Sequence, residues 1–180
     1  RMIYEYGLSH MEVLKSEIAV IGRKEFGVED MDSIFHLAKT KPELLFHSEA
    51  EILTYNTQAL EQAKLKMPQW FSTIPEAPYI VKPYPEYRAK TGAAGQYTPP
   101  SDDGKEPGIF YINTYHPTTR SRVDQEATVF HEIMPGHHFQ VSITKQNRVN
   151  HRLNQYLWNS GYGEGWGLYS ERLADQMGLY

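Results

Sequence analysis

The feature that most constrains the fold of this 180-residue chain is a pair of histidine- and glutamate-rich clusters between residues 128 and 171. The first cluster reads His-Glu-Ile-Met-Pro-Gly-His-His over 131–138, and the second reads Gly-Glu-Gly-Trp-Gly-Leu-Tyr-Ser-Glu over 163–171. Imidazole and carboxylate groups are common protein ligands of zinc. Both clusters lie in sequence typical of helices, so a metal ion shared by them requires two helical segments that pack side by side.

The first cluster departs from the H-E-x-x-H pattern, in which two histidines one helical turn apart bind zinc and the glutamate acts as general base. The residue four positions after His131 is Pro135. On an unbroken helix, His137 would point about 120° away from His131, and His138 would return to the same face about 10.5 Å along the axis. Neither could then share a metal ion with His131, because zinc–nitrogen bonds are only about 2.0–2.1 Å long.

The dipeptide Pro135-Gly136 offers a way around this geometry. Proline lacks an N–H and its ring clashes with the carbonyl four residues earlier, while glycine reaches backbone angles closed to other residues. The sequence therefore predicts a break in the helix that brings His137 beside His131. His138 remains the alternative ligand, and Glu132 is the candidate general base.

The second cluster supplies a carboxylate. Glu164 and Glu171 are seven residues apart, so they share one face of a helix at a spacing of about 10.5 Å and are expected to have different roles. Glycines at alternate positions, Gly163, Gly165 and Gly167, are costly inside a helix and indicate close backbone packing around Glu164. We therefore expect Glu164 to be the metal ligand and Glu171 to orient a histidine.

The two-part motif resembles the bacterial domain-of-unknown-function 885 family, whose members are regarded as zinc metallopeptidases related to the gluzincins. The likeness extends upstream to Gly-Ile-Phe-Tyr-Ile-Asn-Thr over 108–114 and to Leu-Ser-His-Met-Glu-Val over 8–13. It implies a helical, zincin-like fold, metal ligands at His131, His137 and Glu164, and Glu132 as the base. Members of that family are much longer, so this chain is expected to be part of a longer protein.

A strand is expected over Ile109–Tyr115, just before the motif helix, because apolar and aromatic residues alternate there. In gluzincin-like peptidases such a strand walls the cleft and pairs with the extended substrate, and the resemblance implies the same here. An internal strand is the alternative. In the first case Asn113 and Tyr111 are candidates for substrate contacts. His138 and Tyr169 are candidates for stabilising the oxyanion that forms during hydrolysis.

The remaining sequence predicts a mainly α chain with a small β element, an α+β fold in one domain over 1–180. We expect a helical scaffold over 1–66, a proline- and tyrosine-rich loop with the cleft strand over 67–118, and the metal-site helices over 119–180. Two Ser-x-x-Glu patterns, at Ser9 and Ser48, each predict the start of a helix whose apolar face packs in the core.

Charge and composition exclude several classes of function. The formal net charge is -4 and the 18 basic residues form no cluster, so nucleic acid is not an expected partner. No stretch approaches the roughly 18 consecutive apolar residues of a membrane span. The absence of cysteine excludes disulfides and thiolate metal sites. We favour a periplasmic or cell-envelope lipoprotein over a cytoplasmic protein, on the expectation that a signal sequence was trimmed; nothing in the sequence sets an oligomeric state.

These observations predict a zinc-dependent metallopeptidase that binds one Zn²⁺ per chain and hydrolyses a peptide or small amide substrate. Two alternatives use the same residues: a zinc amidase or esterase acting on a non-peptide substrate, and a metal-binding domain without catalytic activity. Metal content separates all three from a metal-free structural module.

Overall fold

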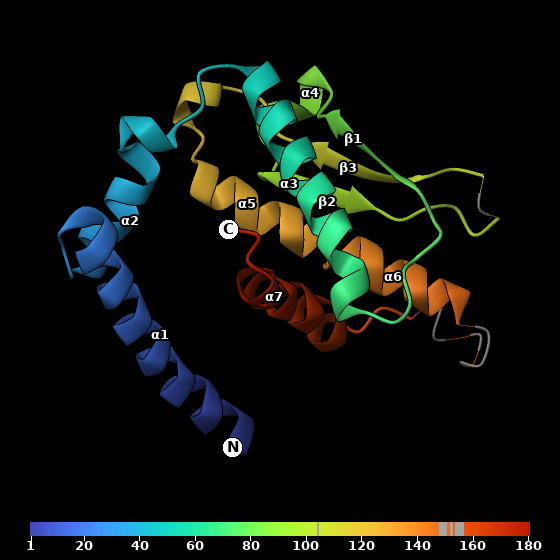
Figure 1. Ribbon diagram of the computed structural model, residues 1–180, viewed down its shortest axis with the longest axis horizontal. Coiled ribbons are helices and arrows are strands. Elements are labelled where there is room, and N and C mark those ends of the chain that lie inside the picture. Colours follow the sequence, from blue (N-terminus) through green and yellow to red (C-terminus); the bar gives the residue numbers. More distant parts are fainter. Residues whose placement is uncertain (104, 148–150, 152, 154–156) are drawn as a thin grey trace. The chain divides into compact units, whose positions relative to one another are not determined.

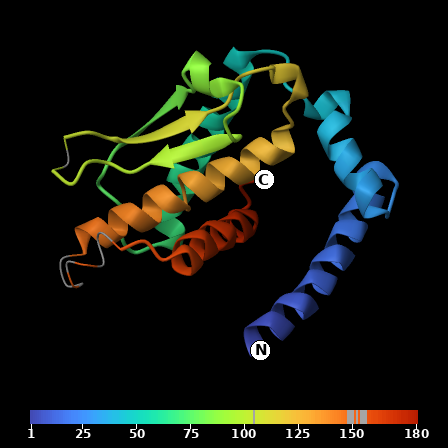
Figure 2. The same ribbon diagram turned by 180° about the vertical axis from the view of Figure 1, so that it is seen from behind.

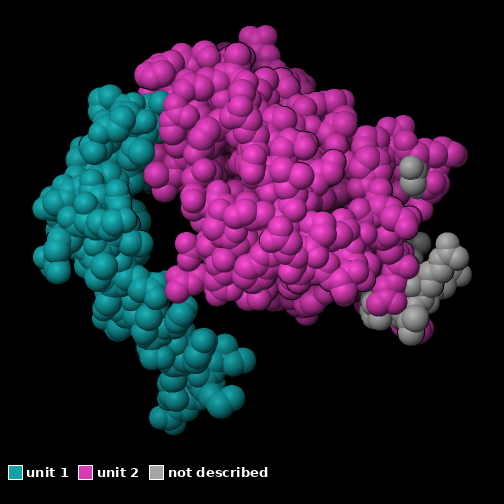
Figure 3. Space-filling model, viewed as in Figure 1, with its two compact units in different colours: residues 1–45 teal, residues 46–180 magenta. Residues whose placement is uncertain are grey.

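The computed structural model describes residues 1–103, 105–147, 151, 153 and 157–180. The chain forms two compact units, residues 1–45 and residues 46–180 (Figure 3). Helices dominate, and the described residues contain one three-stranded sheet, which confirms the α+β class. The boundary between the units lies inside the segment 1–66 that the sequence suggests is a single scaffold.

Unit 1 is a pair of helices, α1 (Met2–Phe26) and α2 (Met31–Thr40), followed by the short 3-10 helix η1 (Pro42–Leu44). α1 ends at Gly27, whose φ of 73° places it in the left-handed region that glycine tolerates best. α2 begins where the Asp30 side chain accepts a hydrogen bond from the Ser33 N–H (2.9 Å). The helices meet closely at Gly22, where an added Cβ would lie 2.1 Å from Ile34 Cδ1.

The start of α1 differs from the expectation. The helix begins at Met2, and Ser9 lies inside it, donating its hydroxyl to the Tyr6 carbonyl (2.9 Å) instead of capping a helix end. A Ser-x-x-Glu pattern caps a helix only where the serine backbone is itself outside the helix. The apolar side chains Met11, Leu14 and Ile21 are exposed, so the predicted packing of this face in a core is wrong for unit 1.

The second Ser-x-x-Glu pattern does start a helix. α3 (Glu49–Trp70) has Ser48 at its N-cap in an extended conformation, and the Ser48 hydroxyl accepts the Glu51 N–H (3.1 Å). The Glu51 carboxylate in turn accepts the N–H of His47 (2.7 Å). These two bonds satisfy donors that the first turn of a helix otherwise leaves without partners.

The proline- and tyrosine-rich segment supplies two strands of the sheet. β1 (Tyr79–Pro83) pairs in parallel with β3 (Gly108–Ile112), β2 (Gly95–Thr98) pairs antiparallel with β3, and the short helix α4 (Glu86–Ala89) lies between β1 and β2 in the chain. The strand order is β1-β3-β2. β3 is therefore the central strand, which agrees with the internal-strand alternative and not with a free edge for a substrate.

The helices of unit 2 form a layer beneath the sheet. Figures 1 and 2 show α5 (Arg122–Glu132) and α6 (His137–Gln146) running one after the other between the sheet and α7 (Ser160–Gln176). The 3-10 helix η2 (Pro117–Thr119) links β3 to α5. The core joins side chains of the sheet, α3 and the three helices, among them Phe46, Ile52, Met67, Phe110, Ile112, Val129, Phe130, Ile133 and Leu173. The metal-site helices are thus packed on both sides.

None of the helices in the described ranges is both long enough and apolar enough to cross a membrane.

The two serine patterns give a direct test of the caps. Replacing Ser48 with alanine removes the hydrogen bond to the Glu51 N–H, and we expect it to lower the free energy of unfolding by about 1 kcal/mol. The matched change Ser9→Ala lies inside α1 and should be neutral or slightly stabilising. Urea unfolding followed by far-UV circular dichroism measures both, and equal losses would contradict the assignment.

Candidate metal centre

The helix break predicted at Pro135-Gly136 separates α5 from α6. α5 ends at Glu132 and α6 begins at His137, with Gly136 as its N-cap at φ -76° and ψ -137°. The backbone of Gly136 lies directly against the end of α5, since an added Cβ would be 1.8 Å from the His131 carbonyl oxygen. Only glycine permits this approach. The break places the His131 and His137 rings edge to face, with centroids 4.7 Å apart.

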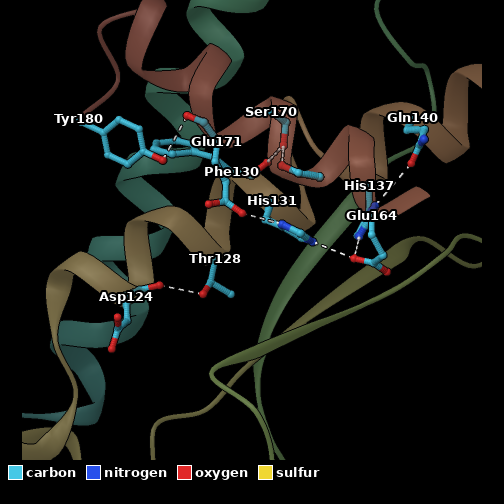
Figure 4. A network of polar contacts seen from close by, with 11 residues as sticks. Asp124, Thr128, Phe130, His131, His137, Gln140, Glu164, Ser170, Glu171 and Tyr180 are labelled. Carbon is cyan, nitrogen blue, oxygen red and sulfur yellow. Dashed lines mark hydrogen bonds and ion pairs between the residues drawn. The ribbon is translucent and has the colours of Figure 1, made fainter. Parts of the chain in front are cut away.

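Glu164 completes a cluster of three potential ligands. Its Oε2 lies 3.3 Å from His131 Nε2 and 3.7 Å from His137 Nε2, and one donor atom from each residue lies within 4.8 Å of the others. Figure 4 shows both imidazoles directed at this carboxylate. Tetrahedral zinc with bonds of about 2.0–2.1 Å separates its ligand atoms by roughly 3.3–3.4 Å. The donor types and their spacing therefore fit a single zinc ion.

Glu171 orients the first histidine, as expected. Its Oε1 lies 2.7 Å from His131 Nδ1, so Nδ1 donates to the carboxylate and Nε2 faces Glu164 (Figure 4). This hydrogen bond is the main reason that the pKa of His131 is raised, and burial opposes it. A carboxylate on the far nitrogen fixes the ring and makes the other nitrogen a stronger metal ligand.

The second histidine is oriented by a residue that the sequence did not point to. His137 is buried, and its Nδ1 lies 3.4 Å from Gln140 Oε1, one turn further along α6. Gln140 Nε2 donates to the Tyr162 carbonyl at the start of α7 (3.1 Å). This chain of contacts holds His137 Nε2 toward Glu164. The i, i+3 spacing on a helix is the only sequence signal that could have identified Gln140.

Two of the three alternate glycines of α7 make room for aromatic rings. A Cβ at Gly167 would lie 2.5 Å from Cε1 of His131, and a Cβ at Gly163 would lie 2.2 Å from the Trp158 ring. A Cβ at Gly165 would meet nothing within 4 Å. The prediction of close packing around Glu164 therefore holds on the face of Gly163 and Gly167 and is wrong for Gly165.

Trp166 connects α7 to the helix break through hydrogen bonds. Its indole N–H donates to the Pro135 carbonyl (2.8 Å) and lies 3.2 Å from the Gly136 carbonyl, while its ring stacks on Phe139. One turn on, the Ser170 hydroxyl contacts the carbonyl of Phe130 (3.0 Å). Carbonyls freed by the break thus find partners on the helix that carries Glu164. The sequence motif contains Trp166, but this role was not foreseen.

Glu132 adjoins the three ligands in a partly enclosed position. Burial raises the pKa of the Glu132 carboxyl above its usual range, and the nearby His137 and His131 imidazoles offset part of that shift. A backbone hydrogen bond from Tyr97, in β2, also favours the charged form. Glu132 is thus a half-buried carboxylate between the cluster of His131, His137 and Glu164 and the edge strand β2.

Two cavities open on either side of His131 and Glu132, which line both. We call the first cavity A; its volume is about 300 Å³ and its other lining residues are Ala93, Ala94, Gly95, Ala127, Thr128 and Glu171. We call the second cavity B; its volume is about 310 Å³ and its other lining residues are Gln96, Tyr97, Pro99, His137, Val141, Trp158 and Glu164. β2 and its flanking residues border both cavities.

His138 lies in the core and not among the ligands. It is fully buried, its Nε2 donates to the Ala77 carbonyl (3.0 Å), and its Nδ1 accepts the Tyr97 hydroxyl (2.9 Å). Burial lowers the pKa of His138 to about 4, so the ring is neutral and can make both bonds. Adjacent helix positions point about 100° apart, which is why one histidine of the pair faces Glu164 and the other faces the sheet.

The other three candidates lie away from the triad. Asn113 directly follows β3 and is fully buried. Its side-chain amide donates to the carbonyls of residues 89, 92 and 93, which precede β2. Tyr111 stacks on Tyr84. Tyr169 is exposed on α7 and packs beside Trp166. None of the three is among the described residues that line cavity A or cavity B.

The comparisons with known proteins show the family that the two-part motif resembles. The family described as bacterial protein of unknown function, DUF885, matches residues 1–180. The chain belongs to this family. It is also similar to a Colwellia psychrerythraea protein, provisionally described as a lipoprotein, whose crystal structure superposes with a TM-score of 0.90 at 27% sequence identity. The match covers 99% of this chain and 32% of that one. No curated protein matches the sequence.

Alanine at Gly167 tests the space reserved for His131. Its Cβ would lie 2.5 Å from the imidazole, so we expect the ring to move and zinc affinity to fall at least about tenfold. Gly165→Ala is the matched control: it should keep zinc affinity and stabilise α7 by up to about 1 kcal/mol. Competition with a zinc chelator and thermal melting measure the two effects. Equal zinc affinities for both variants would count against this geometry.

The Trp166→Phe variant tests the hydrogen bond between the Trp166 indole and the helix break. The change keeps a ring beside Phe139 but removes the N–H that satisfies the buried Pro135 carbonyl. We expect a loss of about 1–3 kcal/mol in the free energy of unfolding. Zinc affinity should fall with it, since the break aligns the two histidines. Trp70→Phe, at the exposed end of α3, is the control and should change neither quantity.

Proposed function

We propose that this protein is a zinc-dependent hydrolase that cleaves peptide bonds. The observation that carries the proposal is the convergence of His131, His137 and Glu164 at distances that suit one tetrahedral ion. Two histidines, one glutamate and an open fourth position are the ligand set of many catalytic zinc sites. A purely structural zinc site is usually closed by four protein ligands, whereas the cluster found among the described residues offers three.

Zinc at this position would supply an activated water and polarise the carbonyl of a bound amide. The protein's own groups would do the rest. Glu132 accepts a proton from the attacking water and passes it to the departing amine, which is the role of a general base and then a general acid. Glu171 and Gln140 hold the two imidazoles in line.

The edge strand β2 favours a peptide over a smaller substrate. Asn113 N–H donates to the Ala94 carbonyl, so residues 94, 96 and 98 pair with β3 and the main-chain groups of Gly95 and Tyr97 face away from it, where the Tyr97 N–H already bonds the Glu132 carboxylate. This edge lies between cavities A and B, beside Glu132. An extended peptide added along β2 would pass directly over the metal ligands. In this proposal β2, and not the central strand β3, offers the edge along which a peptide would bind.

We further propose a location in the cell envelope. The support is that the Colwellia psychrerythraea protein, which matches 99% of this chain, is described as a lipoprotein. Zinc and peptide substrates are both compatible with that compartment. A zinc amidase or esterase would use the same ligands and base, and the peptide edge of β2 is the feature that places peptidase first.

Zinc content and turnover test the function together. We expect one zinc per purified chain by elemental analysis, lost in His137→Ala and kept in His36→Ala, an exposed histidine of unit 1. Glu132→Gln should keep the zinc but lower peptide hydrolysis at least about a hundredfold, because the proton acceptor is gone. Full activity in the Glu132→Gln variant would refute the proposed base. Zinc binding without any hydrolysis would leave a metal-binding domain.

A further inference from the structure

Cavity B has walls unlike those of cavity A. Apart from the metal-site residues they share, cavity A is lined by alanine, glycine and threonine, with Glu171 at one side. Cavity B is lined by larger apolar groups, Tyr97, Pro99, Val141 and Trp158. No lysine or arginine of the described chain lines cavity B, and its carboxylates are Glu132 and Glu164.

Trp158 has the largest side chain among these apolar lining residues. Its indole packs on the backbone of Gly163, where a Cβ would be 2.2 Å from the ring, and meets the His137 ring edge to face at 5.7 Å. The absence of a side chain at Gly163 therefore creates the place in which the indole rests. Even so, 56% of the Trp158 surface is exposed. One face of the indole is packed against the protein, and the rest of the ring is accessible to a bound molecule.

An exposed indole beside a metal site loses contact with water when an apolar group covers it. Burying an aromatic or aliphatic side chain against it is favourable because apolar surface leaves water, and stacked or edge-to-face ring pairs add a further attraction. Pro99 and Val141 supply apolar surface on the other walls of the same cavity. The chemistry of cavity B therefore matches a large uncharged side chain.

We propose that cavity B is the subsite for a large apolar or aromatic residue next to the scissile bond, and that Trp158 determines this specificity. The proposal rests on the proposed function, because it places the bond to be cleaved over His131 and Glu132, which cavities A and B share. A peptide along β2 has one neighbour of that bond in cavity B. Cleavage sites should therefore carry phenylalanine, tyrosine, leucine or methionine at that flanking position.

The test measures hydrolysis of matched blocked peptides that differ only in phenylalanine, alanine or glutamate at the positions flanking the bond. We expect kcat/KM for the phenylalanine peptide to exceed that for the alanine peptide at least tenfold in the zinc-loaded chain. Trp158→Ala should reduce this ratio to within threefold, and Trp158→Phe should keep most of it. Trp70→Ala, which removes an exposed indole far along α3, should leave the ratio unchanged.

A binding measurement separates this proposal from the proposed function. Phenylalanine hydroxamate and alanine hydroxamate bind zinc through the same group, so their affinities for the zinc-loaded Glu132→Gln variant differ only through the side chain. A tenfold preference for the phenylalanine compound that disappears with Trp158→Ala supports the subsite even if no peptide is cleaved. Hydrolysis without a preference, or a preference that survives Trp158→Ala, overturns the subsite and leaves the hydrolase standing.

Discussion

The contact between the Gly136 backbone and the carbonyl of His131 is the constraint on which the rest of the candidate site depends. It lets the chain leave α5 and re-enter a helix within four residues, so that His137 begins α6 with its ring beside His131. Any side chain at position 136 would push the two helices apart. The short distance between the His131 and His137 imidazoles therefore depends on the absence of a side chain at Gly136.

Helix α7 depends on that break and also supports it. Along little more than one turn it provides the Glu164 carboxylate, the indole N–H that binds the Pro135 carbonyl, and the gap at Gly167 that the His131 ring fills. A turn later Glu171 fixes the same ring from its other nitrogen. These contacts act on one another, so a shift of α7 would misalign the third ligand and the first at once. Glycines are costly to the stability of a helix, and two of them, Gly163 and Gly167, lie where rings occupy the space of a side chain.

Much of this site could be predicted from the sequence because its residues lie within about forty positions of one another and follow helical periodicity. The break at 133–136, the convergence of three side chains and the contact of Glu171 with His131 all follow from spacing and from the chemistry of proline and glycine. The strand order could not be predicted in this way. Which strand is central depends on pairing between distant segments, and alternation within 109–115 is the same for an edge strand and a buried one. The exposed face of α1 was missed because an apolar stripe does not show what covers it.

The triad and part of the walls of the two cavities come from different segments of the chain. All three ligands, the residues that orient them and the helix break come from 131–171, and their contacts are with one another. Part of the outer walls of cavities A and B comes from residues 93–99, a segment that contains the short edge strand β2 and tolerates change better than packed helices do. Substitutions in 93–99 can alter the shape beside the metal ligands without touching them. In the proposed hydrolase, residues 93–99 would shape the substrate site together with Trp158, which lines cavity B from the other segment.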